Sequence, residues 1–200
     1  MVRWGMVIDL KRCIGCHACT MACKAENATP PGVFWARVLE KEVGKYPSAK
    51  RTFLPVLCNH CQDPPCERVC PTGATSKGED GIVLVDYKQC VGCRACIIAC
   101  PYQARFYLKE LKPYFPAGMT PYEEVGYAKF EEGTVMKCTF CSHRVEKGLE
   151  PACVITCPTN ARYFGDLNDP SSQVSRLIAD RRGFQLRPEL GTDPSVYYLP

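Results

Sequence analysis

Short apolar runs punctuated by turn-forming residues are the main hydrophobic pattern of this chain. Residues 6–8 (MVI) and 82–85 (IVLV) each lead into a cysteine-rich loop. Residues 105–108 (RFYL) and 162–164 (RYF) each come shortly after a Cys-Pro pair, at 100–101 and 157–158. Each begins with an arginine and continues with aromatic or aliphatic residues. Short runs of this kind, bounded by turn residues, are typical of strands. The pattern therefore predicts four short strands that border the cysteine-rich loops.

Helical patterns are confined to short segments. Residues 18–25 and 95–99 are alanine-rich and are expected to form helices that leave two of the loops. The apolar face of a third, amphipathic helix over residues 171–181 consists of Val174, Leu177 and Ile178. The 17 prolines and 15 glycines oppose long helices and favour turns. We therefore expect an α+β fold built from short elements.

Cysteine is unusually abundant and changes this picture. It accounts for 16 of the 200 residues, so the 46% hydrophobic share includes 8% of cysteine. Ordinary apolar packing is therefore thin for a chain of this length, and something else must help to fill the interior.

The longest stretch without a charged residue is 11 residues, as in 13–23, whereas a membrane-spanning helix needs about 20 apolar residues. No signal peptide is evident at the start.

The cysteines fall into four groups of four, numbered here in chain order. Groups one and three share gaps of two, two and three residues, and groups two and four are variants. The groups are Cys13, Cys16, Cys19 and Cys23; Cys58, Cys61, Cys66 and Cys70; Cys90, Cys93, Cys96 and Cys100; and Cys138, Cys141, Cys153 and Cys157. The spacing of group three, with Pro101 after its last cysteine, is that of bacterial iron–sulfur ferredoxins.

The chemistry of a [4Fe-4S] cubane explains this spacing. A loop with a cysteine at every third position can place three thiolates around one cubane. The fourth cysteine lies too far along, and in two-cluster ferredoxins it binds the other cluster. Gly15 and Gly92 lie inside the loops, where the missing Cβ allows a tight turn and leaves backbone N–H groups free to point at sulfur.

Two other uses of cysteine fit the spacing less well. Disulfides are disfavoured because cysteines three apart in a tight loop are poorly placed to pair, and because no export signal is present. Zinc prefers two separated C-x2-C pairs, whereas gaps of two, two and three followed by proline indicate a cluster. A zinc-organised interaction module remains the alternative from a different class.

An internal repeat organises the groups. An offset of 77 maps group one onto group three, and offsets of 80 and then 87 map group two onto group four, with an insertion after Cys141. Groups two and three are separated by only 19 residues. We therefore expect two ferredoxin-like β-α-β modules, one nested within the other. The inner module comprises residues 58–108, the outer one residues 1–57 plus 109–170, and residues 171–200 form a C-terminal helix and tail.

The exchange of the fourth ligand then predicts four ligand sets. They are Cys13, Cys16, Cys19 and Cys157 for cluster 1; Cys138, Cys141, Cys153 and Cys23 for cluster 2; Cys58, Cys61, Cys66 and Cys100 for cluster 3; and Cys90, Cys93, Cys96 and Cys70 for cluster 4.

The sequence resembles a known family over nearly its whole length. The motifs that carry the resemblance are residues 66–74 (CERVCPTGA), 137–148 (KCTFCSHRVEKG), 151–170 (PACVITCPTNARYFGDLNDP) and 186–192 (LRPELGT). They resemble the four-cluster electron-transfer subunit of the molybdopterin oxidoreductases, of the dimethyl sulfoxide reductase family, and the length is most similar to the polysulfide and arsenate reductase types. Lys24 departs from the pattern because it stands where a proline would follow Cys23.

The resemblance implies four [4Fe-4S] clusters in single file. The group one cluster would face a large molybdopterin catalytic subunit, and the group three cluster an integral membrane subunit that reacts with quinone. It implies a peripheral location on a cytoplasmic-membrane complex, on the extracytoplasmic face if a signal-bearing partner exports the chain, or else in the cytoplasm. The alternative is a soluble polyferredoxin that serves a cytoplasmic hydrogenase, carbon monoxide dehydrogenase or formate dehydrogenase.

Charge and the remaining motifs narrow the function. The formal charge of +4 becomes about −4 when four clusters of about −2 each are bound. Basic residues are intermixed with acids, so nucleic-acid binding is not expected. There is no nucleophile with a paired base and no phosphate-binding glycine motif, so we expect no catalysis and no small-molecule substrate. Residues 26–57 and 109–133 are expected to dock partners rather than to be solvated connectors.

Side chains beside the cysteines have two candidate roles. Arg105, Lys137, Arg144 and Arg162 either raise cluster potentials or form ordinary surface ion pairs. The histidines beside ligands are expected to donate hydrogen bonds or to lie at an interface rather than to bind iron; they are His17, His60 and His143.

Overall fold

A three-stranded sheet joins the two ends of the chain in the computed structural model, which describes all 200 residues. Strand β1 (Trp4–Asp9) lies in its centre, antiparallel to β8 (Arg162–Asp166) and parallel to β9 (Val196–Leu199). Both faces of β1 are covered. Met6 and Ile8 face the main core, and Val7 on the other face packs with Val174.

Three antiparallel pairs make up the rest of the β-structure. Strands β2 (Arg37–Val43) and β3 (Lys50–Val56) form a hairpin. Strands β4 (Thr75–Lys77) and β5 (Val83–Val85) form a short ladder, and β6 (Arg105–Leu108) pairs with β7 (Thr134–Lys137). The four strands predicted beside the loops are thus confirmed as β1, β5, β6 and β8.

The helices that leave the first and third cysteine groups differ in length. Helix α1 (Ala18–Asn27) has ten residues, and α3 (Ala95–Ala99) has five. Helix α3 ends at Ala99 because Pro101, two residues later, cannot continue a helix. In α1 the corresponding position is Lys24, which permits the helix to continue. The Lys24 ammonium then donates to the carbonyls of the following turn.

The remaining helices are short. They are α2 (Pro65–Arg68), α4 (Pro121–Tyr127), α5 (Ser142–Val145), α6 (Ala152–Ile155), α7 (Gln173–Asp180) and the 3₁₀ turn η1 (Pro188–Leu190). In α7, Val174, Leu177 and Ile178 pack with Val7 and Leu199, which confirms the predicted inward face. None of the helices combines the length and the apolar composition that crossing a bilayer would require.

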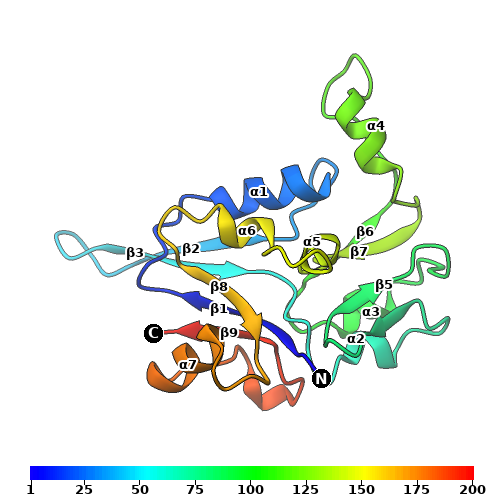
Figure 1. The fold of residues 1–200 in the computed structure, drawn as a ribbon. Helices are drawn as coiled ribbons and strands as arrows, with labels where there is room; N and C mark the ends of the chain where they lie inside the picture. The colour runs from blue at the N-terminus through cyan, green and yellow to red at the C-terminus, as the bar shows by residue number, and fades with distance from the viewer.

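The cysteines are part of the hydrophobic core. The largest core cluster has 23 buried residues, and five of them are Cys19, Cys23, Cys58, Cys138 and Cys153. The mixed α+β architecture with small sheets agrees with the fold class expected from the sequence. Two segments project from this body, the β2–β3 hairpin on one side and the α4 arm, residues 109–133, on another (Figure 1).

Candidate iron–sulfur sites

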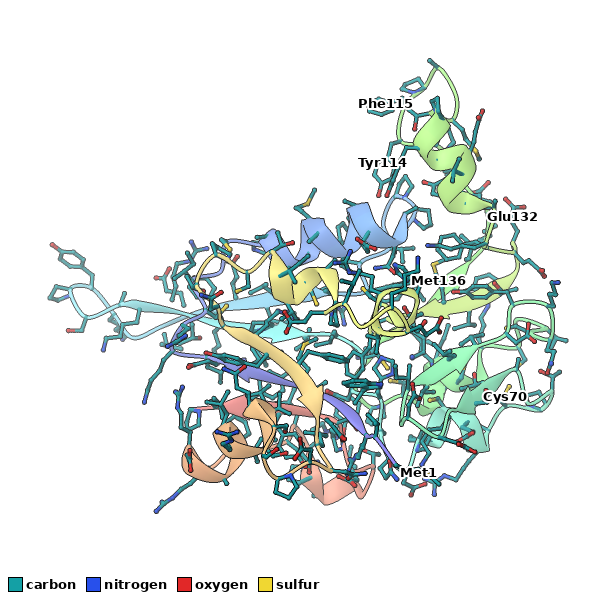
Figure 2. The ribbon with its side chains drawn as sticks, viewed as in Figure 1. Met1, Cys70, Tyr114, Phe115, Glu132 and Met136 are labelled. Carbon is teal, nitrogen blue, oxygen red and sulfur yellow. The ribbon has the colours of Figure 1, made fainter.

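Cysteines from different groups surround common cavities. One cavity is lined by Cys13, Cys16, Cys19 and Cys157, a second by Cys23, Cys138, Cys141 and Cys153, and a third by Cys70, Cys90, Cys93 and Cys96; they are called sites 1, 2 and 4. Each combines three thiols of one group with the last thiol of another. Cys70, which is labelled in Figure 2, lies in the region of α2 and α3, away from the α4 arm.

The four remaining cysteines form site 3. Burial raises the pKa of Cys61 to about 12, to which the nearby thiols of Cys58, Cys66 and Cys100 also contribute. The Thr192 hydroxyl acts in the opposite direction on the same thiol. The structure therefore brings together all four cysteine sets that the sequence suggested as ligands.

Left-handed backbone shapes the two terminal loops. Gly15 and Gly92 have φ of 69° and 63°, and the residues two positions later, His17 and Arg94, have φ of 58° and 63°. A Cβ on Gly15 would lie 2.2 Å from the Phe53 ring, and one on Gly92 would lie 1.9 Å from the Gly133 carbonyl oxygen. Conformation favours glycine at both positions, and at Gly92 the backbone of Gly133 leaves no space for a side chain.

In sites 1 and 4, the cysteine that precedes a proline accepts a hydrogen bond on its sulfur from a backbone N–H group. The backbone N–H of Ala161 donates to Cys157 Sγ at 3.3 Å, and that of Thr75 donates to Cys70 Sγ at 3.5 Å. Burial alone would raise the pKa of both thiols, but these N–H groups and neighbouring threonine hydroxyls lower it. Both cysteines are thus prepared to hold a thiolate.

The central sites are more deeply buried than the terminal ones. Cys16 of site 1 and Cys93 of site 4 are exposed, whereas all four cysteines of site 2 are buried. Burial, followed by the proximity of Cys23 and Cys58, raises the pKa of Cys138 well above its ordinary value. A thiolate in site 2 therefore needs strong compensation from iron or from a nearby cation.

Asn27 is a site residue that the cysteine spacing did not reveal. Its Nδ2 lies 3.7 Å from the Sγ atoms of both Cys23 and Cys141, so one amide joins two thiols of site 2. It lies four residues after Cys23 because α1 continues past Lys24. The missing proline after Cys23 was the only signal in the sequence for this extension.

The three histidines occupy different environments. His17 Nε2 lies 2.8 Å from Glu40 Oε1, and His143 Nε2 lies 2.8 Å from Glu26 Oε1, both near the surface. His60 is fully buried and stacks on Phe140 with ring centroids 3.8 Å apart. Burial lowers its pKa far below the ordinary value, and the N–H of Val83 donates to its Nδ1. The neutral ring therefore carries its proton on Nε2.

The cavities and their unpaired donors fit iron–sulfur clusters. No three His, Cys, Asp or Glu side chains converge on a point that would hold a single metal ion, and the thiols instead surround cavities. Two guanidinium nitrogens of Arg105 and Nε2 of His60 are buried and have no acceptor in the protein. Sulfur atoms of a bound cluster would supply acceptors near the thiols of sites 3 and 4.

Comparisons with known proteins point to the same cofactor. A family model described as a 4Fe-4S dicluster domain matches residues 49–167, and a second model with the same description matches residues 12–74. Together with sixteen cysteines, the two dicluster matches give four [4Fe-4S] clusters per chain. Zinc, which was the alternative metal, receives no support from these matches.

Several curated proteins are similar over nearly the whole chain. A selenate reductase subunit of Mesobacillus selenatarsenatis is 47% identical over 210 residues, which cover 99% of this chain and 72% of that protein. The arsenate respiratory reductase iron-sulfur subunit of a Shewanella species is 40% identical, covering 99% and 96% of the two chains. The iron-sulfur cluster-binding subunit of menaquinone reductase from Nitratidesulfovibrio vulgaris is 39% identical, covering 99% and 89%.

Proposed function

This chain belongs to the 4Fe-4S dicluster family, as an iron–sulfur subunit of the respiratory reductase type, and from that premise we propose that it relays single electrons between two partner subunits. One partner is a quinone-reactive membrane subunit, and the other is a molybdopterin catalytic subunit. When bound, the clusters supply one-electron chemistry, in which each is reduced by one neighbour and oxidised by the next without proton or group transfer.

The observation that carries this proposal is the order of the four sites. Arg162 contacts the Sγ atoms of Cys19 in site 1 and Cys153 in site 2. Cys58 of site 3 lies in the same core cluster as Cys138 of site 2 and contributes to raising the pKa of Cys138. Arg105 interacts with Cys66 of site 3 and Cys96 of site 4. These contacts support a row of sites in the order 1, 2, 3 and 4.

We propose that the four cysteines of each site are the ligands of one cluster. The common cavities and the N–H groups that point at sulfur support these sets. The nested ferredoxin-like modules, 58–108 within 1–57 plus 109–170, are proposed with them. The pairing of β1 with β8, across the whole outer segment, supports this division, and β9 attaches residues 171–200 to the outer module.

The surroundings of both terminal sites are suited to docking a partner. Near site 1, the β2–β3 hairpin carries charged groups, and Glu40 bonds both His17 and Arg51. Near site 4, Val91 and Ile98 are 65% and 87% exposed. Ile14 and Met21, the corresponding residues beside site 1, are 58% and 61% exposed, so exposed apolar side chains do not distinguish the two ends. We therefore assign the site 1 end to the catalytic subunit and the site 4 end to the membrane subunit from the family resemblance. Exposed apolar side chains beside a ligand loop are suited to a buried interface.

The α4 arm is a further docking element. Tyr114, Phe115 and Val125 are exposed on it. Figure 2 shows Phe115 toward its projecting end, whereas Tyr114 lies lower on the arm, where its hydroxyl donates to the Thr29 carbonyl. A capping box at Thr120 and Glu123 fixes the start of α4, so the arm is ordered before any partner binds.

The complex would be peripheral to the cytoplasmic membrane, outside if a signal-bearing partner exports the chain and inside otherwise.

Purification of the tagged chain from its own host tests this function. We expect a large subunit with molybdopterin and a membrane subunit to copurify, and a quinol to reduce the clusters of the complex. Recovery of the chain alone, or with a soluble nickel enzyme, would instead support the polyferredoxin alternative.

Matched variants at the two ends test the direction of transfer. Cys93→Ala should abolish reduction by quinol because the cluster nearest the membrane subunit is lost. Cys16→Ala should leave quinol reduction of the other clusters intact while stopping turnover at the catalytic subunit. The reverse pattern would contradict the assigned orientation.

A further inference from the structure

Three basic side chains are buried in this protein without a carboxylate partner. Arg105, Lys137 and Arg162 are 4%, 1% and 4% exposed. None of them takes part in any of the ten ion pairs of the structure. Burying a charge without a counter-charge is costly enough that natural proteins rarely do so. The counter-charge for these three must therefore come from something other than an acidic side chain.

Arg162 lies between sites 1 and 2. Its Nη2 is 3.5 Å from Cys19 Sγ in site 1, and its Nη1 is 3.7 Å from Cys153 Sγ in site 2. Burial alone would lower the pKa of this guanidinium, but the two thiols outweigh burial and raise it. One cation thus contacts ligands of both sites.

Arg105 lies in the corresponding position between sites 3 and 4. It follows Cys100 by five residues, as Arg162 follows Cys157 by five. Its Nη1 donates to Thr75 Oγ1 at 3.1 Å, while its Nε and Nη2 have no protein acceptor. Burial would lower its pKa, but Cys66 and Cys58 of site 3 and Cys96 of site 4 outweigh burial and raise it.

Lys137 lies between sites 2 and 3. Its Nζ donates to the backbone carbonyl of Cys138, a site 2 residue, at 2.6 Å, and also to the carbonyl of Val83. Val83 belongs to a small hydrophobic cluster with Cys66 of site 3 and Cys96 of site 4, and the Lys137 charge acts to lower the pKa of both Cys66 and Cys138. The ammonium therefore occupies the boundary at which the two middle sites meet.

We propose that each of these three cations lies between two neighbouring clusters, so that one buried positive charge adjoins each electron-transfer step of the relay. Each cation stabilises an added electron on both clusters that flank it and reduces the repulsion between those two anionic clusters. This inference rests on the proposed function and on the proposed ligand sets. It predicts a pattern that a general structural role does not: each substitution alters two neighbouring clusters and spares the other two.

Arg144 provides a matched control. It also lies close in sequence to cluster ligands, but its guanidinium pairs with Glu26 at 3.2 Å, and both side chains are partly exposed. Its charge is therefore already balanced within the chain and screened by solvent. The four basic residues singled out in the sequence thus separate into three buried, unpaired cations and one ordinary ion pair.

Potentiometric titration of the holoprotein, followed by electron paramagnetic resonance, tests the proposal. Arg162→Gln should lower the potentials of clusters 1 and 2, Lys137→Gln those of clusters 2 and 3, and Arg105→Gln those of clusters 3 and 4. The expected change is at least tenfold in the equilibrium constant for one-electron reduction, which corresponds to about 59 mV. Arg144→Gln, which removes a solvent-screened charge paired with Glu26 near Cys141, should give a much smaller shift that is confined to cluster 2.

Charge-conserving variants cover the case in which a glutamine variant fails to assemble. If Arg162→Gln or Arg105→Gln loses the flanking clusters, the lysine variant should restore both clusters at near-parental potentials. Failure of the lysine variant as well would show that shape rather than charge is needed, and would overturn the proposal. The proposal would also be overturned if a glutamine variant kept all four clusters but the potentials of the two flanking clusters did not change. It would likewise be overturned if all four potentials changed by the same amount.

Iron and sulfide content of the parental protein separates this proposal from the function on which it rests. A parental chain with fewer than four clusters would contradict the relay itself. A parental chain with four clusters, and variants without the paired shifts, would contradict only the role of the cations.

Discussion

The central and terminal sites of this protein differ in their access to solvent. Sites 2 and 3 contribute Cys23, Cys58, Cys138 and Cys153 to the largest hydrophobic cluster of the chain, to which site 1 adds only Cys19. Sites 1 and 4 each present one exposed cysteine, Cys16 or Cys93. The middle of the row is thus continuous with the core, and its two ends are open to partners. We infer that the central clusters hold the fold together and the terminal ones exchange electrons.

Removal of all clusters should have the largest effect on this comparison. Nine buried cysteines would then lack iron, and the buried cations would lose their counter-charge. We expect the chain to lose its cooperative unfolding transition, because the total stability of a domain is only about 5–15 kcal/mol. Thermal unfolding monitored by circular dichroism, before and after treatment with a chelator and an oxidant, measures the effect. An apoprotein that still melts cooperatively at the same temperature would contradict it.

Loss of a single ligand should distinguish the centre from the ends. Cys138→Ala should prevent accumulation of folded protein, because Cys138 is buried beside Lys137 and near Cys58. Cys16→Ala should remove about one cluster and leave the remainder folded. Iron content and soluble yield measure both variants. Equal losses in the two variants would remove the distinction between central and terminal sites.

Packing around the sites should show the same contrast on a smaller scale. Phe140 is 1% exposed, stacks on His60 and meets Phe164 edge to face with centroids 5.4 Å apart. Phe140→Ala should cost about 3–5 kcal/mol, whereas Ile98→Ala, on a side chain 87% exposed, should change stability by about 0.5 kcal/mol or less. Denaturant unfolding of the holoproteins compares them. If Ile98→Ala lowered the stability of the isolated chain as much as Phe140→Ala does, the Ile98 side chain would be packed rather than exposed, which would contradict the contrast.

The two terminal loops should respond differently to alanine. At Gly92 a new Cβ would meet the Gly133 backbone carbonyl, whereas at Gly15 it would meet the Phe53 ring, which can rotate away. Both positions have positive φ, which alone costs about 1–2 kcal/mol for alanine. We therefore expect Gly92→Ala to loosen cluster 4 and Gly15→Ala to retain cluster 1. Cluster signals in electron paramagnetic resonance report the outcome, and retention of both clusters would show that the Gly133 segment yields easily.

The Asp9 carboxylate, which lies before the group one loop and bonds no thiol, should affect stability rather than cluster content. Burial would raise the pKa of Asp9, but Arg181 and the N–H groups of Arg12 and Lys11 outweigh it and lower the pKa below 3.8. Its stabilisation is therefore fully present above pH 3.8 and is lost as the pH falls through the folded-state pKa. Asp9→Asn should cost about 1–3 kcal/mol at neutral pH and leave cluster content unchanged. A parental and variant protein of equal stability at neutral pH would contradict this assignment.

Much of the site could be predicted because its determinants are local. The spacing within each group sets the loops, and the fixed offset of 77 places Gly15 and Gly92, and the starts of α1 and α3, at corresponding positions. The strands beside the loops also follow from short apolar runs. The exchange of cysteines between groups followed from the reach of a single loop around one cubane.

The remaining features depend on contacts between distant segments. The parallel pairing of β9 with β1 joins the two ends of the chain, Met6 with Val196 for example, and no local pattern encodes it. Asn27 reaches site 2 only because α1 continues beyond Lys24. Arg105, Lys137 and Arg162 could be named from the sequence, but their burial and their places between sites required the fold. Local spacing thus predicts the candidate ligands, and tertiary packing determines what surrounds them.

The most direct test of the central claim is the iron, acid-labile sulfide and zinc content of the anaerobically purified chain. Four [4Fe-4S] clusters predict about sixteen irons and sixteen sulfides per chain, with no stoichiometric zinc. About four zinc ions without sulfide, or iron for only two clusters, would contradict a continuous four-cluster relay.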